Sequence, residues 1–186
     1  MMMMRISLSA ILLCVSLGCG DDEVCGPGEA AADGVTIEVG GQTITHGDFT
    51  SSPNNDCPDP GGGPTSLTIE GKQTSPAGSA VLTLCVPSPD EIGAAPIPLA
   101  GDDRIQIIDV GGEIDGCRLF RDPAQPASGT ITFFGYCDDG LSPDGYALEL
   151  SGTVPGRRAC PVDAGMTDEP VTLALSGKAA VAAINL

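Results

Sequence analysis

The sequence predicts an all-β protein, an antiparallel β-sandwich of about eight to nine short strands with Greek-key connections. Along most of the chain, apolar and polar residues alternate with a period of two, which places successive side chains on opposite faces of a strand. After the N-terminal segment, no window of 12 residues has a helical period of 3.6. The 26 Gly and 16 Pro residues lie largely between the alternating segments, where they favour turns.

The alternating segments follow one another from residue 35 to the C-terminus. They are 35–39, 42–45, 66–70, 81–86, 104–110, 129–136, 146–154, 171–176 and 179–184. The first two are joined by Gly40-Gly41, which suits a tight hairpin turn. Turn-forming residues 138–145 join 129–136 to 146–154 and predict a second hairpin. The last segment fits a strand or a short helix, and we favour a strand because no helix cap precedes it.

Two connections, residues 46–64 and 87–103, are too long for hairpins. Long loops in compact domains either carry function or are mobile, so these two are the first candidate binding surfaces. Arg157-Arg158 is predicted to form a turn on a surface otherwise rich in carboxylates.

The charge of the chain excludes one class of partner. The sequence has 25 acidic and 8 basic residues, a formal net charge of -17, and its aromatic residues are 4 Phe and 2 Tyr. Such a charge repels phosphate, and the basic residues form no stripe along the sequence, so we expect no nucleic-acid partner. The negative charge favours solubility or attracts cations and basic partners. The length fits a single domain with a thin apolar core.

Residues 1–18 have the features of an export signal. Arg5 and the N-terminal amine are positive, and Ile6–Leu17 is an apolar run of 12 residues. That run is shorter than the ~20 residues that span a bilayer, and it has the length of the apolar region of a secretory signal. A polar, acidic stretch follows, so residues 19–33 are predicted to be a tether and residues 34–186 a single domain.

The residues that end this segment, Ser16-Leu17-Gly18-Cys19, resemble the lipobox of bacterial lipoproteins. In that family, signal peptidase II cuts before the cysteine, which carries acyl chains such as palmitate on its sulfur and usually on its amine. The resemblance implies that Cys19 is lipidated and anchors the chain in the cell envelope, because two or three acyl chains hold far more firmly than one. Gly20 after the cysteine favours the outer membrane. The alternative is an ordinary secreted protein that is cut nearby.

The remaining cysteines predict three disulfides. Cys14 leaves with the signal and Cys19 carries lipid, which leaves Cys25, Cys57, Cys85, Cys117, Cys137 and Cys160. An even number in an exported chain with a thin core indicates a disulfide framework. Between 19 and 31 residues separate neighbouring cysteines, which is unlike the clustered ligands of zinc sites.

The sequence does not choose among the possible disulfide pairings. One pairing, Cys137–Cys160, is disfavoured by the second predicted hairpin. The two residues would lie at its opposite ends, roughly 24 Å apart, and a disulfide needs Cα atoms within about 7 Å.

Three groups of residues offer chemistry beyond a structural role. His46 is the only histidine and can act as a general base with a serine and nearby Asp48, although its simpler role is that of a histidine at the edge of a loop. The turn carboxylates of Asp138, Asp139 and Asp144 are weak calcium candidates, although Asp and Gly also simply form turns. Phe134 and Tyr136 share one strand face and can offer a stacking platform for sugars.

Together these observations predict a cell-envelope lipoprotein that displays a small non-catalytic β-sandwich with a binding or structural role. We expect no cofactor. The predicted partners are the membrane, through the lipid anchor, and an envelope protein or polysaccharide. The alternatives are a small envelope hydrolase that uses His46, and a calcium- or sugar-binding adhesion module.

Overall fold

The computed structural model describes residues 34–53, 66–87, 92–93, 95–136, 145–163 and 165–182 of the 186-residue chain. All regular secondary structure in these ranges is β-strand, and every strand pairing is antiparallel. The predicted all-β antiparallel class is therefore confirmed. In the same ranges there is no helix able to span a membrane.

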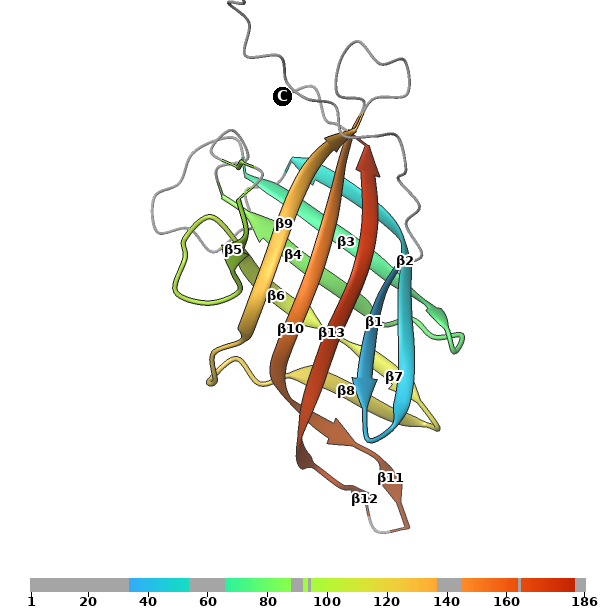
Figure 1. The fold of residues 1–186 in the computed structure, drawn as a ribbon. Coiled ribbons are helices and arrows are strands. Elements are labelled where there is room, and N and C mark those ends of the chain that lie inside the picture. The colour runs from blue at the N-terminus through green and yellow to red at the C-terminus, as the bar shows by residue number, and fades with distance from the viewer. Residues whose placement is uncertain are drawn as a thin grey trace, which may run out of the picture.

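Thirteen strands lie within the described ranges (Figure 1). They are β1 (Gly34–Val39), β2 (Gln42–Pro53), β3 (Leu67–Ser75), β4 (Val81–Val86), β5 (Ile97–Pro98), β6 (Gln106–Val110), β7 (Gly112–Ile114), β8 (Cys117–Arg121), β9 (Ser128–Tyr136), β10 (Gly145–Ala159), β11 (Pro161–Val162), β12 (Gly165–Met166) and β13 (Glu169–Ala182). Eleven of them form one sheet in the order β5-β9-β10-β13-β1-β2-β3-β4-β6, with β8 paired to β10 and β7 to β8. β11 and β12 form a separate small hairpin.

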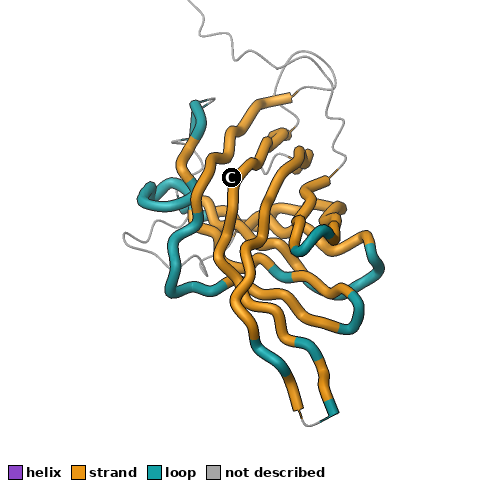
Figure 2. Tube along the Cα trace, turned by 60° about the horizontal axis from the view of Figure 1, so that its bottom comes forward, coloured by secondary structure: helices purple, strands orange, loops and turns teal. Residues whose placement is uncertain are grey.

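The large sheet folds over on itself into two facing layers. Figure 1 shows β9, β10, β13 and β1 in front of β3, β4 and β6, which run across them at an angle. The view of Figure 2 shows the strands curving around a shared interior. Side chains from both layers fill this interior, among them Ile37, Ile44, Ile69, Leu82, Leu84, Ile131, Leu148, Leu150 and Leu173. One continuous sheet thus supplies both walls of the core.

The two predicted hairpins are present. β1 and β2 pair with Ile37 opposite Ile44, and Gly40 and Gly41 make the turn with φ angles of 56° and 79°. Such positive φ angles suit glycine, which has no Cβ to clash with the backbone. β9 and β10 pair continuously, from Gly145 opposite Tyr136 to Thr153 opposite Ser128. Local alternation and turn chemistry therefore predict these two hairpins correctly.

The predicted surface turn at Arg157-Arg158 is wrong, because both residues lie within β10. The strand continues five residues past its predicted end and has partners on both sides there. Arg157 lies opposite Phe120 of β8 and opposite Pro170 of β13. These two ladders keep the backbone extended where the sequence loses its apolar alternation.

β2 also runs further than predicted. It continues to Pro53, so the first eight residues of the predicted loop 46–64 are strand. The pairing with β3 shifts register between Gly47 and Thr50, where Asp48 has a φ of 49°. This bulge interrupts the alternation and hides the strand from a pattern-based prediction.

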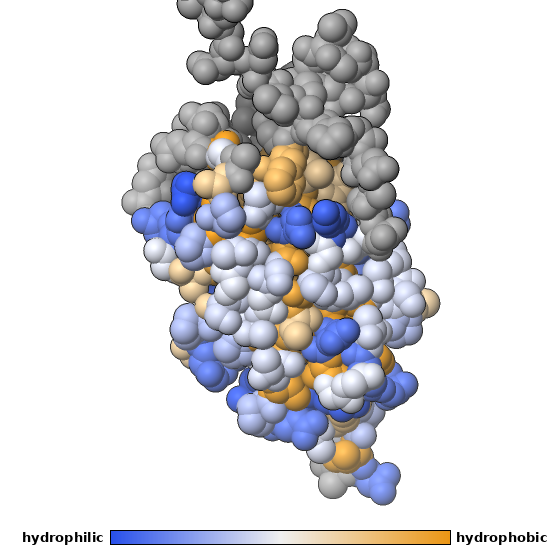
Figure 3. Space-filling model, in the orientation of Figure 1, coloured by the Kyte–Doolittle hydropathy of each residue, from blue (hydrophilic) through white to orange (hydrophobic). Residues whose placement is uncertain are grey.

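The outer face of the sheet carries a row of hydroxyl residues. In register across six strands, the row consists of Thr130, Ser151, Ser176, Thr36, Thr45 and Ser75. The hydroxyl oxygens of Thr36 and Ser176 lie 3.1 Å apart, and such cross-strand pairs stabilise a sheet. Figure 3 shows the front of the molecule as mostly white and blue, with orange apolar areas between the polar residues.

Candidate functional site

The structure describes only some of the predicted site residues. Cys19, Cys25, Cys57, Cys137, Asp138, Asp139 and Asp144 lie outside the described ranges. The predictions of a lipidated cysteine and of a weak calcium site therefore stay predictions. Cys85, Cys117, Cys160 and His46 lie within the described ranges.

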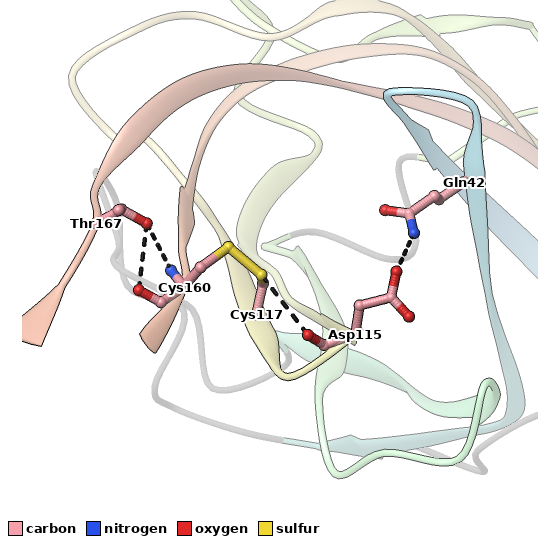
Figure 4. The surroundings of a disulfide bond; sticks show 5 residues. All are labelled: Gln42, Asp115, Cys117, Cys160 and Thr167. Atoms are coloured by element: carbon pink, nitrogen blue, oxygen red, sulfur yellow. Dashed lines mark hydrogen bonds between the residues drawn. A yellow bond between two sulfur atoms is a disulfide. The ribbon is translucent and has the colours of Figure 1, made fainter. Parts of the chain in front are cut away.

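Cys117 and Cys160 form a disulfide with an S–S distance of 2.04 Å and a Cα separation of 4.2 Å (Figure 4). The bond joins the first residue of β8 to the residue that follows β10. Cys85 is also disulfide-bonded. Cys160 therefore has Cys117 as its partner, and the pairing with Cys137 that the hairpin disfavoured does not occur.

Hydrogen bonds hold the chain around this disulfide. The Thr167 hydroxyl accepts from the Cys160 amide at 3.1 Å and donates to the Cys160 carbonyl at 3.2 Å. The Thr167 amide also donates to that carbonyl, at 2.8 Å. On the far side of the bond, the Gln42 side chain donates to the carboxylate of Asp115 (Figure 4). The base of the β11–β12 hairpin is thus fixed to the sheet.

His46 lies in the middle of β2. The expectation of a histidine at the edge of a loop is therefore wrong. The His46 side chain has an exposed fraction of 0% and points into the core on the same face as Ile44. Neither ring nitrogen has a partner with hydrogen-bond geometry. Burial lowers the pKa of His46 to about 4, and the nearby backbone of Gly111 acts in the opposite direction with a smaller effect.

This placement separates His46 from the partners that hydrolysis requires. A general base must reach the proton that it removes from a nucleophile or substrate. The imidazole is enclosed, whereas Asp48, the predicted orienting carboxylate, is exposed within the bulge. The structure therefore does not bring these two residues together.

Of the predicted sugar platform, the described part is Phe134. Its side chain lies on the outer face of β9 with an exposed fraction of 41%, whereas the neighbouring Phe133 is buried on the inner face. An exposed aromatic ring can stack on an apolar ligand face.

A surface cleft of about 460 Å³ lies where the segment before β6, strand β6, strand β8 and the segment before β9 meet. This volume is within the range of ~300–1,000 Å³ that is common for ligand sites. Its lining residues are Leu99, Ala100, Gly101, Asp102, Asp103, Ile105, Gln106, Ile107, Ile108, Arg121, Pro126 and Ala127. The end of the predicted loop 87–103 thus forms one wall of the cleft.

The charged residues that line this cleft are Asp102, Asp103 and Arg121. Arg104 binds the carboxylate of Asp102 through Nε at 2.9 Å and Nη2 at 2.7 Å, and these bonds lower the pKa of Asp102 to about 2. Arg121 instead donates from Nη1 to the carbonyl of Ile107. Arg121 makes no ion pair with a carboxylate in the part of the chain that the structure describes.

Sequence reasoning missed Arg121 as a site residue. The segment Cys117-Arg118-Leu119-Phe120-Arg121 alternates, but two of its five side chains are charged, so its strand character is weak in the sequence. The available signal is the alternation along the strand, which places Arg121 on the same face as the buried Cys117 and Leu119. Arg121 therefore lies on the inner side of β8, and Arg118 faces the solvent.

Metal-binding geometry is absent from the described ranges, where no three His, Cys, Asp or Glu side chains are grouped to hold an ion. Comparisons of the chain with protein-family models, with curated proteins and with solved structures find no match. The cleft lined by Ile107, Ile108 and Arg121, which we call the Arg121 cleft, is therefore the candidate site on the basis of its geometry alone.

Proposed function

We propose that the chain is a lipid-anchored protein of the bacterial cell envelope that displays one β-domain with a non-catalytic binding role. The observation that carries this proposal is the Cys117–Cys160 disulfide. Structural disulfides belong to oxidising compartments, which a chain reaches by export. Export is also what the lipobox-like residues before Cys19 imply.

The binding role is supported by the cleft, which is lined both by buried apolar residues and by the polar residues Asp102, Asp103, Gln106 and Arg121. That combination is typical of ligand sites. The hydrolase alternative has lost its main support, because the imidazole of His46 is enclosed in the core. We therefore favour binding over catalysis.

The anchor is tested by the intact mass of the protein extracted from membranes of the native host. We expect a mass that corresponds to residues 19–186 plus acyl chains, and no alkylation of thiols before reduction. Cys19→Ser should abolish acylation and release the protein from the membrane fraction. Cys14→Ser is the matched control, because that residue leaves with the signal and its replacement should change neither mass nor location.

Two outcomes of the mass measurement would contradict the proposal. If the wild-type protein is unacylated and stays in the soluble fraction, the chain is secreted and Cys19 returns to the pool of thiols. Free thiols among the other six cysteines would contradict the disulfide framework.

A further inference from the structure

We infer that the Arg121 cleft binds a small organic anion, with a carboxylate held at the Arg121 guanidinium and an apolar body along β6. This inference names a ligand class for the proposed binding role and rests on that role. It is independent of the lipid anchor, so the two proposals can fail separately.

The apolar half of the site comes from β6 and the segments beside it. Ile105, Ile107 and Leu99 are almost fully buried and form the floor. Ile108 lines the same cleft with an exposed fraction of 39%, which is high for a large aliphatic side chain. A hydrocarbon group that covers Ile108 removes apolar surface from water, which favours binding.

The polar half is the guanidinium of Arg121. Its bond to the Ile107 carbonyl holds the group against the strand that provides the floor. In a chain with a net charge of -17, this half-buried cation has no carboxylate partner in the described ranges. A guanidinium binds carboxylates through short, charge-assisted hydrogen bonds, so an external carboxylate fits the charge that the fold leaves uncompensated.

The acidic residues of the cleft set the limit on the ligand's charge. Arg104 already compensates Asp102. Asp103 is exposed, so water and salt screen its repulsion of an anion more than they screen the attraction of half-buried Arg121. A monoanion is therefore favoured over a cation or a multiply charged anion.

The test uses the chain from residue 19 onward with Cys19→Ser, so that neither acyl chains nor detergent competes for the cleft. Amide chemical shifts are followed by NMR at neutral pH and low salt during titration with octanoate, octanamide and octylamine. We expect octanoate to shift the amides of residues 99–108 and 121, and the other two probes to bind at least tenfold more weakly.

Substitutions separate the contributions of the charges. Arg121→Gln should weaken octanoate binding by about tenfold or more, since a charge-assisted hydrogen bond is lost. Arg118→Gln is the matched control, because it removes the same charge from the solvent-facing side of the same strand and should change the affinity little. Asp103→Asn should tighten binding by about two- to fivefold, and Arg104→Gln should weaken it by exposing the charge of Asp102.

Asp103→Asn and Arg104→Gln keep the inference testable if Arg121→Gln misfolds, because neither residue holds the Ile107 carbonyl. The inference is overturned if octanamide or octylamine binds as tightly as octanoate. It is also overturned if the shifts map outside the cleft, or if Asp103→Asn and Arg104→Gln leave the affinity of octanoate unchanged.

Discussion

Cys117 and Cys160 are 43 positions apart in the sequence, and their bond brings their Cα atoms to within 4.2 Å of each other. The bond fixes β8 to the end of β10, next to the ladder in which Arg121 lies opposite Gly156. Arg121 is four residues from Cys117 on the same short strand. The disulfide therefore anchors the strand that supplies the cation of the cleft.

Removal of this disulfide should destabilise the domain markedly. For a loop of 43 residues, the loss of chain restriction in the unfolded state corresponds to about 4 kcal/mol in the free energy of unfolding. The double variant Cys117→Ser, Cys160→Ser should show a lower urea midpoint than the wild type under non-reducing conditions. Equal midpoints would show that the bond contributes no stability.

Stability should fall in mildly acidic solution because His46 is buried in its neutral form. The pKa of His46 is about 4 in the folded chain and 6.5 in an unperturbed histidine, so the unfolded chain binds more protons between these two pH values. The stabilisation is fully present above pH 6.5 and is lost as the pH falls towards 4. The loss corresponds to about 3 kcal/mol.

The test compares urea unfolding of the wild type and of His46→Leu across this pH window. Carboxylates also titrate there, so the difference between the two slopes is the measured quantity. The leucine variant should have the flatter profile, and parallel profiles would argue against a buried neutral imidazole.

Gly177 should tolerate no side chain. It has a φ of 140°, and an added Cβ would fall on the carbonyl oxygen of Gly34 in the neighbouring strand. Gly177→Ala should therefore lower the urea midpoint far more than Gly41→Ala, which has a φ of 79° but open space around it. The control carries only the backbone strain of about 1–2 kcal/mol, and equal effects would mean that the β1–β13 contact is looser than described.

Core and cleft isoleucines should respond differently to truncation. Ile131 is fully buried between the layers, and Ile131→Ala should lower the free energy of unfolding by about 2–5 kcal/mol. Ile108→Ala removes a partly exposed side chain and should lower it by less than ~1 kcal/mol. Chemical denaturation of both variants measures the difference, and a large loss for Ile108→Ala would assign that residue to the core.

Local patterns in the sequence predict the parts of this fold that are local. The β1–β2 and β9–β10 hairpins each combine clean alternation with turn residues, and both are present. β8 is not predictable in this way, because its strand character depends on the partners β7 and β10 and not on its own charged residues. The same holds for Arg157 and Arg158, which two neighbouring strands keep extended.

The candidate site was predictable only in part. The sequence predicts the long connection 87–103 as a candidate surface, and the end of this connection provides one wall of the cleft. The opposite wall comes from Arg121 and Ala127, and nothing in a linear pattern indicates that these residues meet β6. The sequence does not show that His46 lies inside a strand, because the bulge after it breaks the alternation that marks the first residues of β2.

The pairing of β1 with β13 has a consequence for how the chain reaches its final state. β1 has β2 on one side and β13 on the other, and its contact between Thr36 and Ser176 spans 140 positions. The β1–β2 hairpin can form early, but one of its edges stays open until residues 169–182 have been synthesised. Such high contact order slows folding and leaves a strand edge available for aggregation. The sheet can therefore be completed only after residues 169–182 have been made. Until then, we expect the open edge of the β1–β2 hairpin to need protection from aggregation.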